Sequence, residues 1–454
     1  MSRTFKGGFH PPEKKELSKD CAITQVFPST KLVSIPISQG GAPNKPLVAV
    51  GDEVARGQKI AETDAFMSAP VHSSVAGKVK KIEWKTGVGN TEIQCITIEA
   101  DDSGRTDFLP VVDPFSLDPK AANERVREAG ITGMGGASFP THVKLNVPPG
   151  KTIEYVLANG AECEPYLTID ERTMAETPHR VVDGLAIVMH ITSAKKGIIA
   201  LEDNKKHLEP VLNEAIAKSG FANIEVMVVK TKYPQGGEKM LVKSVTGREI
   251  PSGGLPADAG CCINNVGSLC AISDAFREGK PLIDRPLTIS GECVENPMNI
   301  VVPIGTMVGD LIPEPIHLKP GIAKIIAGGP MMGFSMMNAN FPITKNTSGV
   351  LFLPANVVST KPQSPCLNCG FCVKTCPCQL VPVMIVKSLK AGNLTDAVTY
   401  GLRDCILCGT CSAGCPAAVQ LVGYFREGKT ELAKQDAAAR AKAAAEKAAK
   451  EGGK

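Results

Sequence analysis

Eight cysteines near the C-terminus form two runs with the same spacing. Each run reads C-x2-C-x2-C-x3-C-P, and each ends at a proline, Pro377 or Pro416. Thiolates are soft ligands that select iron–sulfur clusters or zinc. Three thiolates in one tight loop reach three corners of a cubane, and the turn at the proline carries the fourth one away. Zinc modules usually pair C-x2-C units instead, so the spacing favours two [4Fe-4S] clusters over two zinc sites.

The two runs resemble those of two-cluster ferredoxins, in which the fourth cysteine of each run ligates the other cluster. We therefore expect crossed ligation. The ligands of cluster I would be Cys366, Cys369, Cys372 and Cys415. The ligands of cluster II would be Cys405, Cys408, Cys411 and Cys376. The other eight cysteines lack ligand spacing, and we expect most of them to be small buried side chains.

A second group of candidate residues lies upstream. The loop T-G-M-G-G-A-S-F-P contains Gly133, Gly135 and Gly136, and such glycines let the backbone approach a phosphate or a flat ring closely. The segment A-N-G-A-E-C-E-P-Y ends a predicted strand, where an open α/β sheet places its ligand contacts. Two more segments, Y-P-Q-G-G-E-K-M-L and I-N-N-V, follow. These three segments supply Asn159, Glu162, Glu164, Gly236, Glu238, Asn264 and Asn265. Taken singly, each segment could be a capped turn.

The elements that position these residues change in type along the chain. From about residue 35 to 98, short β segments broken by Gly and Pro predict a small β barrel or sandwich. The stretch resembles the biotinyl and lipoyl carrier hairpins, but its tip, residues 64–68 (D-A-F-M-S), has no lysine to carry a cofactor. A structural role is therefore favoured for this unit.

The middle of the chain alternates helices and strands. Helices are predicted over residues 119–129, 180–190 and 208–218, and strands over 153–158, 198–202 and 224–230. This alternation predicts a parallel α/β sheet. From about residue 282 the sequence predicts β structure again and resembles a β-grasp ligand-binding module of flavin dehydrogenase subunits. Its simplest role is that of a spacer that positions its neighbours.

The predicted architecture is therefore multidomain, with α/β and β units. The predicted units are a carrier-like β barrel-sandwich (1–117), a parallel α/β flavin and nucleotide domain (118–280), a β-grasp, SLBB-like module (281–357), a helical two-cluster ferredoxin-like domain (358–425) and an Ala/Lys-rich tail (426–454). The tail has helix formers but no apolar stripe over residues 431–454, so we expect an exposed or fraying helix there.

The composition agrees with a folded multidomain chain. The 454 residues include 43% hydrophobic and 21% charged residues, and no apolar run is long enough to span a bilayer. The N-terminus shows no signal-peptide stretch, which predicts a cytoplasmic location. In a reducing compartment, sixteen cysteines point to ligation and not to disulfides. The small net charge of +4 predicts no nucleic-acid partner.

Taken together and in this order, the four upstream segments resemble the flavin- and NADH-binding subunit of respiratory complex I and related bacterial hydrogenases. The match covers about residues 125–270. It implies an FMN site lined by Gly133, Gly135, Gly136, Ala137, Lys144, Asn159, Glu162, Asn264 and Asn265. It also implies that Glu164 and Phe139 are catalytic residues facing the nicotinamide dinucleotide. The chain departs from the family motifs at Ala161, Gly237 and Gly267.

With the cysteine runs and the N-terminal F-K-G-G-F-H-P-P segment, the whole chain resembles the RnfC family of electron-transport proteins. The resemblance implies a peripheral subunit on the cytoplasmic side of the cell membrane. With the other subunits of the Rnf complex, it would move electrons between NADH and ferredoxin while sodium ions or protons are pumped. Two alternatives are a flavin subunit of a soluble bifurcating hydrogenase or dehydrogenase, and a non-catalytic electron relay with a degenerate nucleotide fold.

Overall fold

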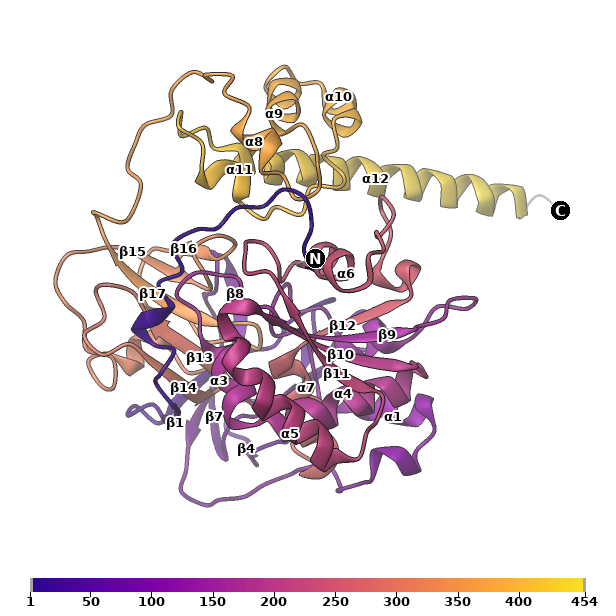
Figure 1. Ribbon diagram of the computed structural model, residues 1–454. Helices are drawn as coiled ribbons and strands as arrows, with labels where there is room; N and C mark the ends of the chain where they lie inside the picture. Colours follow the sequence, from indigo (N-terminus) through magenta and orange to yellow (C-terminus); the bar gives the residue numbers. More distant parts are fainter. Residues whose placement is uncertain (1–2, 452–454) are drawn as a thin grey trace.

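The computed structural model describes the backbone of residues 3–451 and the side chains of residues 3–443. Its elements form a barrel-sandwich, a parallel α/β domain, a six-stranded β module and a small helical unit, as Figure 1 shows. The expected multidomain α/β and β fold is confirmed. The last three residues of the predicted tail, 452–454, lie outside the described residues.

The barrel-sandwich is built from two small antiparallel sheets with strand orders β2-β8-β7-β4 and β3-β5-β6. Val33, Ile35, Ile96 and Ile98 are fully buried, because alternate side chains of β2 and β8 point inward. The strands are β2 (Leu32–Pro36), β3 (Lys45–Pro46), β4 (Glu53–Val54), β5 (Lys59–Glu62), β6 (Val71–His72), β7 (Gly77–Thr86) and β8 (Glu92–Ala100).

The α/β domain has a four-stranded parallel sheet in the order β11-β10-β9-β12. Successive residues of β9 point to opposite faces: Val156 joins the core that contains Leu185, whereas Leu157 joins the core that contains Leu241. Helices therefore cover both faces of the sheet. The strands are β9 (Tyr155–Gly160), β10 (Lys196–Glu202), β11 (Ile224–Val229) and β12 (Cys261–Asn265).

The helices of this domain are α1 (Pro119–Glu128), α2 (Thr141–Leu145), α3 (Ile169–Glu176), α4 (Pro178–Thr192), α5 (Glu209–Ser219), α6 (Glu238–Thr246) and α7 (Val266–Arg277). Helices α4 and α7 pack closely, because a side chain at Gly184 would collide with the Leu269 carbonyl. The predicted helices correspond to α1, α4 and α5, and the predicted strands to β9, β10 and β11. Helices α2, α3, α6 and α7 were not predicted.

The third unit is a six-stranded mixed sheet in the order β1-β14-β13-β17-β15-β16. Its first strand comes from the N-terminal segment and pairs parallel with β14, Thr24 lying opposite Ile300. Leu287, Phe341 and Phe352 fill its core. The strands are β1 (Ile23–Gln25), β13 (Asp284–Ser290), β14 (Met298–Pro303), β15 (Ile322–Ala327), β16 (Phe334–Met336) and β17 (Gly349–Pro354).

The helical unit at the C-terminal end holds both cysteine runs. Its last helix, α12, begins inside the unit and buries Phe425 and Leu432 against it, and Arg403 forms an ion pair with Asp436. Figure 1 shows the rest of α12 projecting away from the unit. The helices are α8 (Phe371–Lys374), α9 (Pro382–Lys390), α10 (Leu394–Thr399), α11 (Thr410–Ala413) and α12 (Leu421–Glu451).

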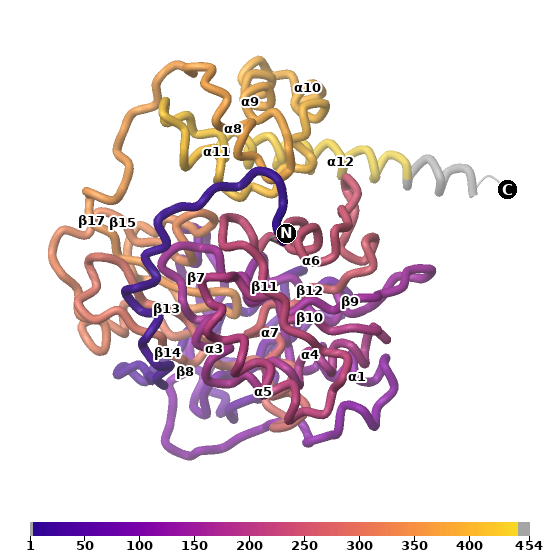
Figure 2. Tube along the Cα trace, viewed as in Figure 1, coloured from indigo at the N-terminus to yellow at the C-terminus, as the bar shows by residue number. Residues whose placement is uncertain are grey.

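The N-terminal segment joins these units. Figure 2 shows it running between the helical unit and the α/β domain before it reaches β1. Gly8 donates its N–H to the Thr375 carbonyl at 2.8 Å, and Phe9 pairs with Tyr233 through two backbone hydrogen bonds. The segment is therefore a backbone bridge between the cysteine unit and the α/β domain. Within the described part of the chain, no helix is both long enough and apolar enough to cross a membrane.

Candidate functional site

Two asparagines meet at the carboxyl edge of the parallel sheet. Asn159 is the last residue but one of β9 and lies opposite Asn265, which ends β12. The Asn159 amide donates to the Gly236 carbonyl at 2.8 Å, and the Asn265 side chain caps α7 by accepting the Gly267 N–H at 2.9 Å. Three of the four motif segments therefore converge at the edge where parallel α/β sheets bind their ligands.

The glycine-rich loop follows α1 and lies against this edge. A Cβ at Gly135 would come within 2.9 Å of the Asn265 amide nitrogen, so the loop backbone lies close against this side chain. No described atom lies within 4 Å of where a Cβ at Gly136 would stand, and residues 135–137 are exposed. The loop leaves an open cradle of backbone beside amide side chains, which fits a flavin ring or its phosphate.

Lys144 supplies the positive charge of the same edge. It lies on α2, directly after the glycine-rich loop, and its ammonium donates to the Ile263 carbonyl and to Glu238, both at 2.9 Å. Glu238 begins α6. Asn264 is buried beside Cys262, and Phe139 remains 39% exposed at the end of the loop.

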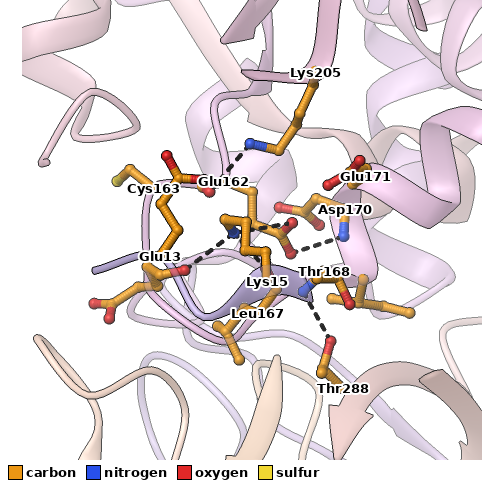
Figure 3. Close-up of polar contacts among 12 residues, drawn as sticks. Glu13, Lys15, Glu162, Cys163, Leu167, Thr168, Asp170, Glu171, Lys205 and Thr288 are labelled. Atoms are coloured by element: carbon orange, nitrogen blue, oxygen red, sulfur yellow. Dashed lines mark hydrogen bonds and ion pairs between the residues drawn. The ribbon is translucent and has the colours of Figure 1, made fainter. Parts of the chain in front are cut away.

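Glu162 lies in a buried network of charged side chains, which Figure 3 shows. One oxygen accepts the Asp170 N–H at 2.9 Å, and the other lies 3.6 Å from the Lys15 ammonium. That second oxygen has no hydrogen-bond partner among the described residues. Burial, and then the nearby charge of Glu162, raise the pKa of Asp170 to about 7. Asn265 donates to Asp170 at 2.7 Å, so the network also touches the sheet edge.

Glu164 also binds within the protein. Its two carboxylate oxygens accept the N–H groups of Met331 and Met332, at 3.0 and 2.9 Å. These residues belong to the glycine-rich turn after β15, and a side chain at Gly329 would collide with the carboxylate. Burial raises the pKa of Glu164 to about 7, although the two N–H groups oppose the shift. The carboxylate thus joins the β module to the α/β domain, and its position facing the dinucleotide stays a prediction.

Three cysteines of the first run and two of the second run lie around one cavity. The cavity measures about 500 Å³, and Cys366, Cys369, Cys372, Cys411 and Cys415 line it. The fourth cysteine of the second run therefore faces the first three of the first run, as crossed ligation requires. Cys366, Cys369, Cys372 and Cys415 are the four thiols predicted to hold cluster I, and a cavity lined by such soft ligands fits an iron–sulfur cubane. The fifth cysteine of the lining, Cys411, is a predicted ligand of cluster II. Cys366 and Cys369 are exposed, so this cluster site faces outward.

The second cysteine run instead lies against the α/β domain. The hydroxyl of Tyr233 donates to the Cys408 carbonyl at 2.7 Å. Asp404, next to Cys405, accepts from Lys239 at 3.2 Å and from Ser252 at 2.6 Å. Cys376 completes this group from the first run, and its carbonyl abuts Gly7 of the N-terminal segment. The predicted cluster II would therefore lie beside the α/β domain.

Several residues of the site were not predicted. Asp170 binds Asn265, Arg285 donates to the Met134 carbonyl inside the glycine-rich loop, and Asn346 donates to Gly136. Arg285 and Asn346 come from the β module, and nothing in their local sequence marks them. Tyr233 directly precedes the P-Q-G-G-E segment, so that motif was the one available signal.

A flavin-type α/β domain in contact with a unit of two cysteine runs defines a class of flavin and iron–sulfur electron-transfer proteins. Family models match each part of the chain. They are the RnfC barrel sandwich hybrid domain (residues 3–103), the Nuo51 FMN-binding domain (126–274), the SLBB domain (286–335) and the 4Fe-4S dicluster domain (365–419). The expected FMN and [4Fe-4S] cofactors are confirmed by these matches.

The chain belongs to the RnfC family of ion-translocating oxidoreductase complexes. It is 44% identical over 440 residues to the RnfC-type component of the proton-translocating ferredoxin:NAD(+) oxidoreductase complex of Clostridium ljungdahlii, covering 95% of this chain and 94% of the relative. It is 40% identical to the corresponding component of the Na(+)-translocating ferredoxin:NAD(+) oxidoreductase complex of Acetobacterium woodii, covering 95% and 98%. The fold is also similar to an NAD+-reducing [NiFe]-hydrogenase in the H2-reduced state, with a TM-score of 0.50, 20% identity, and coverage of 70% and 63%.

Proposed function

We propose that this chain is the subunit of an ion-translocating Rnf complex that transfers electrons between NADH and ferredoxin, using FMN and two [4Fe-4S] clusters. One observation carries the proposal: the second cysteine run lies directly against the domain that holds the flavin-type loop edge, through Tyr233 and Asp404. Electron transfer requires such closeness between the redox groups, and a mere scaffold does not. The names of the relatives support the reaction and the complex.

FMN between NADH and the clusters would supply the conversion between two-electron hydride exchange and one-electron transfer. This chain's own residues would bind and orient that group. The cradle at Gly135 and Gly136 receives it, the amides of Asn159 and Asn265 lie at the sheet edge, and Lys144 offers a cation. The remaining contacts proposed from the sequence are Gly133, Ala137, Gly236, Glu238 and Asn264. Of these, Gly236 accepts from Asn159 and Glu238 accepts from Lys144.

Glu162 and Glu164 would act indirectly. Each carboxylate is held by backbone N–H groups or Lys15, so each positions a loop of the site. Phe139, which is exposed at the end of the glycine-rich loop, would face the dinucleotide. The five units proposed from the sequence would divide these tasks, with the β module supplying the contacts of Met331, Met332 and Asn346.

The chain would be a peripheral subunit on the cytoplasmic side of the cell membrane, held there by other subunits of the complex. The names of its relatives as subunits of translocating complexes support this placement. The soluble hydrogenase alternative is less well supported, because the hydrogenase likeness concerns the fold alone, whereas the N-terminal unit matches the RnfC barrel model.

The test is an anaerobic purification followed by iron, sulfide and flavin analysis, with an NADH-reduction spectrum on the same sample. We expect about eight irons per chain, as two cubanes require, together with bound FMN that NADH bleaches. Eight irons without flavin would reduce the protein to an electron relay. Co-purification with membranes, lost when the other subunits are deleted, would separate the Rnf assignment from a soluble enzyme.

A further inference from the structure

The tip of the carrier-like hairpin, residues 64–68, lies directly beside the flavin-type loop. The Phe66 carbonyl lies 3.1 Å from Nε2 of His142, and the two rings meet edge to face with centroids 6.0 Å apart. His142 follows Phe139 by only three residues. Gly40, at the base of the same tip, approaches the Ser138 carbonyl so closely that a side chain there would collide with it. The tip and the glycine-rich loop therefore meet along residues 138–142.

The tip is rigid. The Ala42 N–H donates to the Met67 carbonyl at 2.6 Å, and the Ser68 hydroxyl donates to the Asn44 side chain at 2.8 Å. Gly40 and Gly41 have φ values of +105° and +82°, which favour glycine and allow the close approach. A swinging carrier arm would need freedom at this point. These contacts instead hold the tip in one place.

Large apolar side chains stand exposed around this junction. Phe66 is 58% exposed, Met67 41% and Phe139 39%, next to the open cradle at Gly136. Exposed apolar side chains at the border of a polar, glycine-lined site mark a binding surface for a flat ring. Aromatic faces and methionine suit such a ring, because both offer polarizable contact at little cost in conformational entropy.

We propose that the hairpin tip, through Phe66 and Met67, forms the outer wall of the dinucleotide site and binds the adenine ring. The inference rests on the proposed NADH function. The nicotinamide ring must reach the flavin at the sheet edge, so the other ring of the dinucleotide has to lie further out. The glycine-rich loop leads from Gly135 at that edge to Phe139 and the tip. The barrel thus contributes to the active site the same tip that carrier domains use for a cofactor.

The test compares two probes on the full chain with its clusters and flavin bound. ADP-ribose carries the adenine without the nicotinamide, and nicotinamide mononucleotide carries the nicotinamide without the adenine. Their dissociation constants would be measured by calorimetry for the wild type, Phe66→Ala, Phe66→Leu and Phe66→Trp. The matched control is Phe27→Ala, since Phe27 is 49% exposed on the same unit and its neighbour Thr30 contacts Asp310 of the β module instead.

We expect Phe66→Ala to weaken ADP-ribose binding about tenfold, as the loss of one base–aromatic stack does. Phe66→Leu should lose less of the affinity for ADP-ribose, and Phe66→Trp should keep all of it. The affinity for the mononucleotide and the flavin content should stay unchanged in all three variants. Equal ADP-ribose affinity in Phe66→Ala and the wild type would overturn the inference alone, as would equal losses for both probes. A flavin-loaded wild type that binds neither probe would overturn the proposed function as well.

Discussion

The hydroxyl of Tyr233 donates a 2.7 Å hydrogen bond to the backbone carbonyl of Cys408, with both residues buried. This bond joins the strand end of the α/β domain to the loop of the second cysteine run. The backbone of Tyr233 also pairs with Phe9, so the N-terminal bridge and the cysteine unit meet at one side chain. The contact therefore holds the second cysteine run against the α/β domain.

Replacing Tyr233 with phenylalanine leaves the buried Cys408 carbonyl without this donor, which costs about 1–3 kcal/mol. We expect earlier thermal unfolding of the cysteine unit and slower reduction of the clusters by NADH, followed by stopped-flow absorbance. Tyr166→Phe is the control, because it loses a similar bond, to Glu292, away from the cysteines. If Tyr233→Phe keeps the wild-type reduction rate while Tyr166→Phe slows it, the bond has no role in positioning the cluster.

The ligand assignment predicts different iron contents when Cys405 and when Cys378 is replaced by serine. Cys405→Ser removes a predicted ligand of cluster II and should lower the iron content from about eight to about four per chain. Cys378→Ser changes a thiol just two residues after Cys376 and should leave about eight irons. Iron and sulfide analysis of anaerobically purified protein measures both. A loss of iron in Cys378→Ser would mean that the runs do not ligate as their spacing indicates.

Lys144 should contribute to flavin retention. It is the cation at the sheet edge, and a charged hydrogen bond to an anionic ligand is worth about 1.5–3 kcal/mol. We therefore expect Lys144→Ala to weaken FMN binding roughly 10- to 100-fold, measured by fluorescence of the released flavin. Lys151→Ala is the control, because Lys151 is half-exposed and pairs with Asp258. Equal flavin retention in both variants would remove Lys144 from the site.

The burial of Lys345 predicts that the free energy of unfolding depends on pH. Its ammonium is buried between three units and donates to the carbonyls of Pro70 and Gly130, at 2.8 and 2.7 Å. Burial lowers its pKa to about 7, whereas a lysine in the unfolded chain titrates near pH ~10.4. Between these values the unfolded chain binds more protons, so this group makes the protein more stable as pH rises and less stable as pH falls toward 7.

Lys345→Met removes that titration. From pH 7 to pH 10, the urea concentration at the unfolding midpoint should therefore rise more for the wild type than for the variant. Both midpoints would be measured in parallel. Lys80→Met serves as the control, since Lys80 is exposed on β7 and pairs with Glu99 at the surface. A midpoint difference that stays constant with pH would show that Lys345 does not change its protonation on unfolding.

The features that could be predicted from the sequence are those encoded locally. The four cysteines from Cys366 to Cys376 lie within one short stretch of the chain, so their spacing is visible without tertiary contacts. The alternation of strands and helices is also visible, because each element has its own local pattern of apolar residues. Asn159 and Asn265 lie at the carboxyl ends of two strands of one sheet, and parallel strands bring these ends to the same edge.

The directions of the two glutamates could not be predicted, because distant segments set them. Lys15, which contacts Glu162, comes from the N-terminal segment, and its ammonium also donates to the Glu164 carbonyl, 149 positions along the chain. The N–H of Met331, which binds the Glu164 carboxylate, lies 167 positions further on. The same holds for the hairpin tip: its lack of lysine was visible in the sequence, but its contact with His142 was not.

The measurement that tests the account most directly is the reduction by NADH of single-cluster variants, followed by electron paramagnetic resonance. Cys366→Ser should lack cluster I and Cys405→Ser should lack cluster II, each retaining about four irons. We predict that NADH reduces the remaining cluster in Cys366→Ser and fails to reduce it in Cys405→Ser, because the second run lies at the flavin domain. Rapid reduction in Cys405→Ser with none in Cys366→Ser would contradict the account.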